Sequence, residues 1–127
     1  MSCPHCGADA VSFAVPPALR EHAPASTTAI CTRCLRTFPA DESESTPADV
    51  PDLSAVDLAF PDGDAGVALA LVCGHLESFA LNRASIEFLT ERAERAGADP
   101  LAFLDRLDAP DAAFDLERRR AALLDIL

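Results

Sequence analysis

Two Cys-x2-Cys pairs near the start of the chain constrain its fold more than any other feature. The first pair is Cys3 and Cys6, the second is Cys31 and Cys34, and residues 7–30 lie between them. Each pair places two thiols on a tight turn, and a tetrahedral Zn²⁺ site needs two such turns converging from separate parts of a chain. We therefore predict that the four cysteines bind one structural Zn²⁺. Tetrahedral all-sulfur sites also accept iron, whereas a thioredoxin-type redox site needs one pair rather than two. Zinc is the preferred interpretation.

The segment around these cysteines, residues 1–38, is predicted to be a zinc ribbon. Short strands are expected at Val11–Val15, Thr27–Ile30 and Leu35–Phe38, with one helical turn at Ala18–His22. Gly7 follows the first pair and permits a left-handed turn that points backbone amides at sulfur. His5, inside that turn, is expected to face solvent. A core this small needs the roughly 10–16 kcal/mol that zinc supplies to such peptides.

The charge of the chain is strongly acidic. It carries 21 Asp and Glu against 10 basic residues, all of them Arg, for a formal net charge of −11. Such a charge self-repels at low salt, but the Debye length falls to roughly 3 Å in molar salt. We interpret the lysine-free composition as adaptation to a high-salt cytoplasm. A hydrophobic content of 50% argues against a disordered chain.

The same composition bears on location and partners. We expect a cytoplasmic protein without a signal peptide, because Cys3 begins the metal motif at once. The most apolar run, residues 66–74, is far shorter than the roughly 20 residues of a membrane span. In a reducing compartment, paired cysteines bind metal more often than they form disulfides. Nucleic acid is disfavoured as a partner, since polyanions are repelled overall.

Residues 39–62 are predicted to be an acidic linker without regular structure. Four prolines (39, 47, 51 and 61) and seven acids without a base support this. The stretch 41–47 is expected to be the most mobile. Apolar residues late in the linker are expected to dock on the ribbon or on the helices: Leu53, Val56, Leu58 and Phe60.

Residues 63–127 are predicted to form a small antiparallel bundle of three or four helices, which makes the fold class α+β. Apolar residues recur at helical spacing in four sets: Leu69, Val72, Leu76 and Phe79; Ile86, Leu89, Ala93 and Ala96; Leu101, Leu104 and Leu107; and Leu116, Leu123, Leu124 and Leu127. A break is expected near 81–84. Asp99-Pro100 and Asp115 are helix starts, and Gly97 is a C-terminal cap.

Other reactive or charged residues are given structural interpretations. Cys73 is expected to be a small core hydrophobe, and His75, two residues on, points elsewhere on the helix. Glu77, Glu91, Glu94 and Arg95 are expected on a solvated face. The Arg118–Arg120 run has acids beside it, so a solvated face is again favoured over a phosphate contact.

The knuckle Cys3-Pro4-His5-Cys6-Gly7, with Cys31-Thr32-Arg33-Cys34 as its partner, resembles the small CPxCG zinc-ribbon proteins that are abundant in haloarchaea. The whole chain is similar to a haloarchaeal family with a ribbon, an acidic linker and a helical tail, through residues 31–35 with Pro39 and residues 92–107. The resemblance implies a four-cysteine zinc site and a halophilic host. It implies no catalytic residue.

Two functions are weighed. The first is a non-enzymatic adaptor or regulator that binds another protein, because a closed four-cysteine site leaves no position for a substrate water. The second is a nucleic-acid-associated factor of transcription or translation, with Arg20, Arg33 and Arg36 as contacts. Convergence of these arginines on one patch would favour the second, and dispersal among acids the first. An enzyme is not expected, and no catalytic residue is assigned. Self-association is expected through the apolar segment Val67–Phe79.

Overall fold

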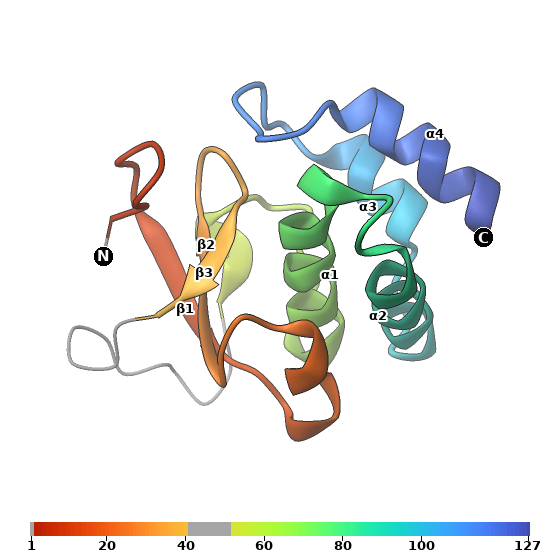
Figure 1. Ribbon diagram of the computed structural model, residues 1–127, viewed down its shortest axis with the longest axis horizontal. Coiled ribbons are helices and arrows are strands. Elements are labelled where there is room, and N and C mark those ends of the chain that lie inside the picture. The colour runs from red at the N-terminus through yellow and green to blue at the C-terminus, as the bar shows by residue number, and fades with distance from the viewer. Residues whose placement is uncertain (1, 41–51) are drawn as a thin grey trace.

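The computed structural model describes residues 2–40 and 52–127 and has an α+β fold. A three-stranded antiparallel sheet lies at one side of the molecule, and the helices lie at the other (Figure 1). The predicted fold class is thereby confirmed in its coarse form. Among the described residues, every helix is too short or too polar to cross a bilayer.

The sheet has the strand order β1-β2-β3. Strand β1 spans Ala10–Ala14, β2 spans Thr27–Cys31 and β3 spans Thr37–Pro39, each within two residues of its prediction. The 3-10 helix η1, Pro17–His22, connects β1 to β2 where one helical turn is predicted. In the register, Ala10 pairs with Cys31 at one end of the sheet and Ala14 with Thr27 at the other.

The helices begin and end close to their predicted positions. They are α1 (Gly63–His75), the 3-10 turn η3 (Leu76–Ser78), α2 (Arg83–Arg95), α3 (Pro100–Arg106) and α4 (Leu116–Ile126). Asp99 accepts a hydrogen bond from the Ala102 N–H and Asp115 one from the Arg118 N–H, both at 3.1 Å. These are the N-caps that the sequence predicts. Gly97 has a φ of +95°, as a C-terminal cap requires.

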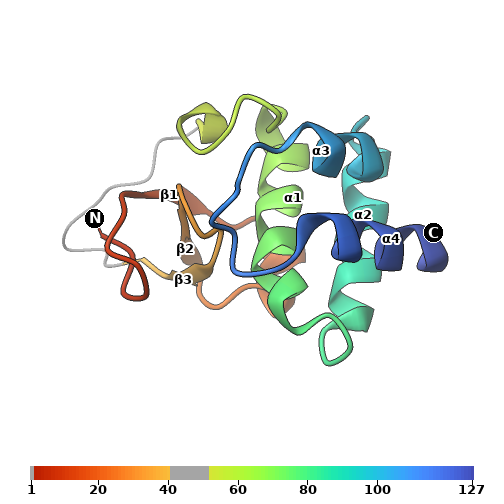
Figure 2. The ribbon, with the colours of Figure 1, turned by 90° about the horizontal axis from the view of Figure 1, so that it is seen from above.

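Helix α1 is the central element, between the sheet and the remaining helices (Figures 1 and 2). Every residue from Ala65 to Cys73 is buried. A helix that is apolar all round belongs in a core. The apolarity of α1 is therefore accounted for by its place in the core of one chain.

One hydrophobic core joins the predicted ribbon to the predicted bundle. Phe13, Ile30 and Leu35 come from the sheet side, and they belong to the same cluster as Leu69 of α1 and Leu123 of α4. Helix α1 also lies so close to β3 that a Cβ on Gly74 would clash with the Thr37 side chain. The sheet and the helices are thus packed together as one body.

The linker prediction needs correction in its described part. Residues 53–55 form the 3-10 helix η2 (Leu53–Ala55), begun by an Asp52 side chain that accepts from the Ser54 N–H. Leu53 and Phe60 are buried in the shared core, as the docking prediction requires, whereas Leu58 is 89% exposed. This short helix forms despite the neighbouring prolines because Asp52 caps its start and Leu53 and Phe60 are buried in the core. The predicted mobile stretch 41–47 lies outside the described residues.

The predicted buried face of the last helix is wrong in part. Within α4 and the residue after it, Leu123 is buried, whereas Leu124 and Leu127 are 53% and 52% exposed. Figure 1 shows the reason, because α4 runs along the outside of the molecule. A helix with one neighbouring layer buries one narrow stripe, and leucines beside that stripe stay in solvent.

Candidate metal centre

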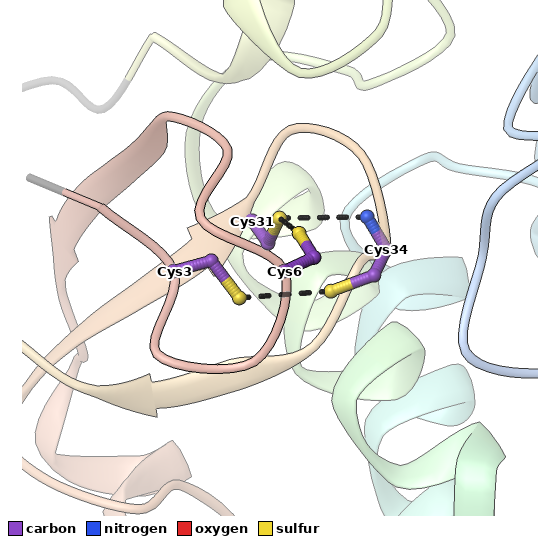
Figure 3. A group of neighbouring side chains, drawn as sticks. All are labelled: Cys3, Cys6, Cys31 and Cys34. Atoms are coloured by element: carbon purple, nitrogen blue, oxygen red, sulfur yellow. Dashed lines mark hydrogen bonds between the residues drawn. The ribbon is translucent and has the colours of Figure 1, made fainter.

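The two cysteine turns meet at one end of the sheet. The first turn leads into β1 and the second follows β2, and the pairing of Ala10 with Cys31 places them side by side. Figure 3 shows the four cysteine side chains pointing toward one another from these two turns. The antiparallel register is what brings together residues that are 25 and 31 positions apart.

The first turn is held by backbone hydrogen bonds. The Cys3 N–H donates to the Ala8 carbonyl at 2.8 Å, and the Gly7 N–H donates to the Cys3 carbonyl at 2.9 Å. Gly7 has a φ of +77°, the left-handed conformation predicted for it. His5 is exposed, also as predicted.

The second turn reaches the same conformation without glycine. The Cys31 N–H donates to the Arg36 carbonyl at 2.9 Å. Leu35 has a φ of +62°, which is unusual for a residue with a Cβ, and its side chain is buried in the shared core. The side chain of this residue anchors the turn to the helices.

The sulfur positions fit a tetrahedral site. The Sγ atoms of Cys6 and Cys31 are 3.4 Å apart, those of Cys3 and Cys34 are 3.7 Å apart, and all four lie within 4.8 Å of one another. A Zn–S distance near 2.3 Å gives tetrahedral sulfur–sulfur edges of about 3.8 Å. All four cysteines are free thiols. They can bind a metal ion.

Backbone amides surround the sulfur atoms. The His5 N–H donates to the Cys3 Sγ, and the Arg33 and Cys34 N–H groups donate to the Cys31 Sγ, each at 3.4 Å. Such donors favour the thiolate over the thiol. They are the kind of second-layer contact that orients a metal ligand.

Burial and hydrogen bonding shift the pKa values of these thiols in different directions. Burial acts to raise the pKa of Cys3, but hydrogen bonds from the Cys6 and His5 backbone and from the Cys34 and Cys31 thiols together outweigh it and lower the pKa to about 7. Burial dominates at the second turn, where it raises the pKa of Cys31 and raises that of Cys34 to about 12. Without a metal, the second pair therefore keeps its protons at neutral pH.

Cys73, His22 and His75 lie away from the cysteine cluster. Cys73 is buried in α1, and desolvation raises the pKa of its thiol to about 12, which suits the predicted core role. A His75 Nε2 contact to the His22 carbonyl at 2.6 Å and a His22 Nδ1 contact to the Ser85 Oγ at 2.9 Å tie η1 to the helices. These histidines have structural partners.

The three arginines considered for a phosphate contact do not converge. Arg36 pairs with Glu77 at 3.2 Å, so it bridges the second turn to the helical layer. Arg20 follows β1 at the opposite end of the sheet, where its Nε donates to the Val15 carbonyl at 3.1 Å. Arg33 is exposed beside the cluster.

A polar groove of about 440 Å³ adjoins the cysteine turns, and it was not predicted. Its lining includes Arg33 together with Asp9, Asp108 and Asp111. The loop between α3 and α4 forms its far wall, and the Ala113 N–H donates to the Cys34 carbonyl at 2.8 Å. The sequence gives no sign of this contact, because it joins residues 79 positions apart, 113 − 34, with no motif in common.

Neither a curated protein nor a solved structure matches the chain. The sequence pattern of one family matches it over residues 2–127, nearly the whole length, so that the cysteine turns, the sheet and all the helices fall within the match. This chain belongs to that family, a family of unknown function (DUF6276).

Proposed function

We propose that this chain is a non-enzymatic zinc-ribbon protein that acts as a protein-interaction adaptor or regulator in a high-salt cytoplasm. The observation that carries the proposal is the closed cysteine cluster, in which four sulfur atoms lie within 4.8 Å and three of the four cysteines are buried. A metal ion bound by four protein thiolates has no open position for a substrate or an activated water. The role of such an ion is structural, as a link between the two turns.

Zinc is the proposed ion. Four thiolates with sulfur separations of 3.4 and 3.7 Å suit the short Zn–S bonds of a tetrahedral site. The same donors accept iron. The test is elemental mass spectrometry on protein purified in molar KCl, and the expected result is one zinc per chain. Iron, or protein without metal, would contradict the assignment.

The surroundings of the cluster favour a protein partner over nucleic acid. The exposed Arg33 lines a groove that also contains three aspartates. Arg36 forms an ion pair with Glu77. Arg20 lies at the other end of the sheet. With a net charge of −11, this surface repels phosphate. The alternative, a nucleic-acid-associated factor of transcription or translation, rests on Arg33 as its nearest exposed cation.

The two functions differ in a binding experiment. Fluorescence anisotropy with labelled RNA and DNA, from physiological to molar KCl, is expected to show no saturable binding. The matched variants are Arg33→Glu beside the cluster and Arg83→Glu on α2, which changes the same charge at a distance. Binding that Arg33→Glu abolishes and Arg83→Glu spares would replace the adaptor proposal with the alternative.

A further inference from the structure

The outer face of α3 and α4 carries an apolar groove that the fold leaves open. The groove has a volume of about 560 Å³; its apolar lining consists of Leu104, Leu107, Leu116, Ala121 and Leu124, and Asp105, Glu117 and Arg120 complete it. Leu127, the residue after α4, lines a neighbouring hollow with Leu101. Two half-exposed leucines beside a groove are costly to leave in water.

The charge of this face differs from that of the rest of the molecule. Helix α4 carries three arginines against Glu117 and Asp125, a local excess of one positive charge on a chain of −11. Arg120 pairs with Asp105 at 2.6 Å, and Arg119 lies over the Phe79 ring at 5.9 Å. Another copy of this acidic chain is therefore repelled less here than at an average surface.

Helix α4 has three exposed charges, Glu117, Arg118 and Asp125, and the last two have opposite signs. Arg118 and Asp125 are both exposed, and neither forms an ion pair within the described part of the chain. They are seven residues apart, so they lie almost on one line along the helix. Ala121 and Ala122 lie midway between them and leave room for close approach.

This pattern is complementary to itself. If two α4 helices lie antiparallel about a two-fold axis near Ala121 and Ala122, Arg118 of each copy faces Asp125 of the other. A two-fold interface repeats every contact, so both ion pairs form together. In this arrangement the α3 helices of both copies lie on the same side of the α4 pair. On that side, Leu124 of one copy reaches the α3–α4 groove of the other.

We infer that the α3–α4 face is a self-association surface, and that its occupant is a second copy of this chain with its α4 antiparallel to the first. In this interface, Leu124 of each copy lies in the α3–α4 groove of the other, and an Arg118–Asp125 ion pair lies at each end of the α4 contact. Because the net charge of each copy opposes association at low salt, the dimer strengthens as KCl rises toward molar concentration. The inference does not depend on the metal proposed above.

The first test is sedimentation velocity in molar KCl over a range of protein concentrations. The wild type is expected to dimerise, and Leu124→Gln is expected to raise the dissociation constant about a hundredfold, since a dimer buries two copies of this leucine. Leu81→Gln is the matched control, because Leu81 is 88% exposed but lies between α1 and α2. A wild type that stays monomeric, or a dimer that Leu124→Gln leaves unchanged, would overturn the inference.

The second test examines the antiparallel register by charge exchange, at physiological ionic strength as well as in molar KCl. Arg118→Asp and Asp125→Arg should each weaken the dimer, because each places like charges opposite one another. The double variant Arg118→Asp with Asp125→Arg restores the pairs and is expected to restore the dimer. If the double variant is as weak as the single ones, the proposed arrangement is wrong. Zinc content, measured on every variant, is expected to stay constant.

Discussion

At the scale of single residues, the two cysteine turns reach one backbone conformation by different means. Gly7 has no Cβ to oppose a positive φ, whereas Leu35 adopts a φ of +62° with a side chain that is only 1% exposed. A left-handed residue costs roughly 1–2 kcal/mol, and full burial of a leucine contributes about 1.5–3 kcal/mol. Burial therefore outweighs the backbone cost at Leu35. The sequence predicts the Gly7 turn from residue type, but it cannot predict Leu35, because the compensation comes from distant helices.

The cysteine cluster predicts which thiols are needed for the metal. Cys6→Ser is expected to reduce the metal content to well under one ion per chain, because the exposed Cys6 completes the set of four sulfur atoms. Cys73→Ala is the control, since Cys73 is buried in α1 and lies outside the cluster. Elemental analysis of the two variants distinguishes them. Full metal content in Cys6→Ser would show that three cysteines suffice.

The shifted pKa values predict how metal affinity changes with pH. Cys31 and Cys34 have raised pKa values, about 12 for Cys34, so both are protonated without metal at neutral pH. The metal must displace both protons. Its apparent affinity should therefore rise at least a hundredfold for each pH unit, and more steeply below about 7, where Cys3 also becomes protonated.

Competition titrations against a chelator of known affinity measure this slope. Calorimetry in buffers of different ionisation enthalpy counts the released protons directly. Fewer than two protons released per metal at pH 8 would contradict the assignment.

At the scale of elements, the contact between α1 and β3 decides how the two layers fit. Gly74 lies against the Thr37 side chain, with no room for a Cβ between them. The Arg36–Glu77 pair and the hydrogen bond from Ala113 to Cys34 close the same side of the interface. These contacts connect the helical layer to the turn that carries Cys31 and Cys34.

A double-mutant cycle tests this close packing. Gly74→Ala is expected to reduce the free energy of unfolding by about 1–3 kcal/mol through overpacking, although alanine favours the helix by about 1 kcal/mol. In a Thr37→Gly background the obstacle is absent, and Gly74→Ala should be neutral or stabilising. Chemical denaturation of the four proteins gives the coupling. Equal effects of Gly74→Ala in both backgrounds would mean that Thr37 is not the obstacle.

Elements were more predictable than the faces they bury. Helix ends follow from local chemistry, and the caps at Asp99, Asp115 and Gly97 lie where the sequence indicates. The exposure of Leu124 and Leu127 does not follow from local chemistry. Periodicity gives the spacing of apolar residues along a helix, but not the number of layers that pack against it. The sequence pattern alone does not distinguish an exposed leucine such as Leu124 from a buried one such as Leu123.

At the scale of the whole molecule, the sheet and the helices share one core, and the buried cysteines form a small cluster beside it. The sequence suggests two parts joined by an acidic linker, since the charge and proline content change sharply near residue 39. Sheet residues such as Phe13 and Ile30 nevertheless pack in one cluster with α1. Contacts between such distant segments leave no mark in local composition, so the shared core could not be predicted.

Metal removal tests whether the sheet and the helices share one core. Because the core is shared, chelation is expected to weaken amide-exchange protection in β2 and α1 together and to lower the midpoint of one thermal transition. Hydrogen exchange suits this chain, which has no Trp or Tyr for fluorescence. Loss of protection in β2 with full protection in α1 would instead support two independently folding parts.

The burial of Leu123 has a consequence for synthesis. The core that it completes also contains Phe13 and Ile30, so this shared core stays incomplete until residue 123 has left the ribosome. At typical elongation rates, the four cysteines emerge on the order of ten seconds earlier. A metal ion captured in that interval would hold the nascent sheet in register before its helical cover exists. Zinc supply during translation would then influence the yield of folded protein more than zinc supply afterwards.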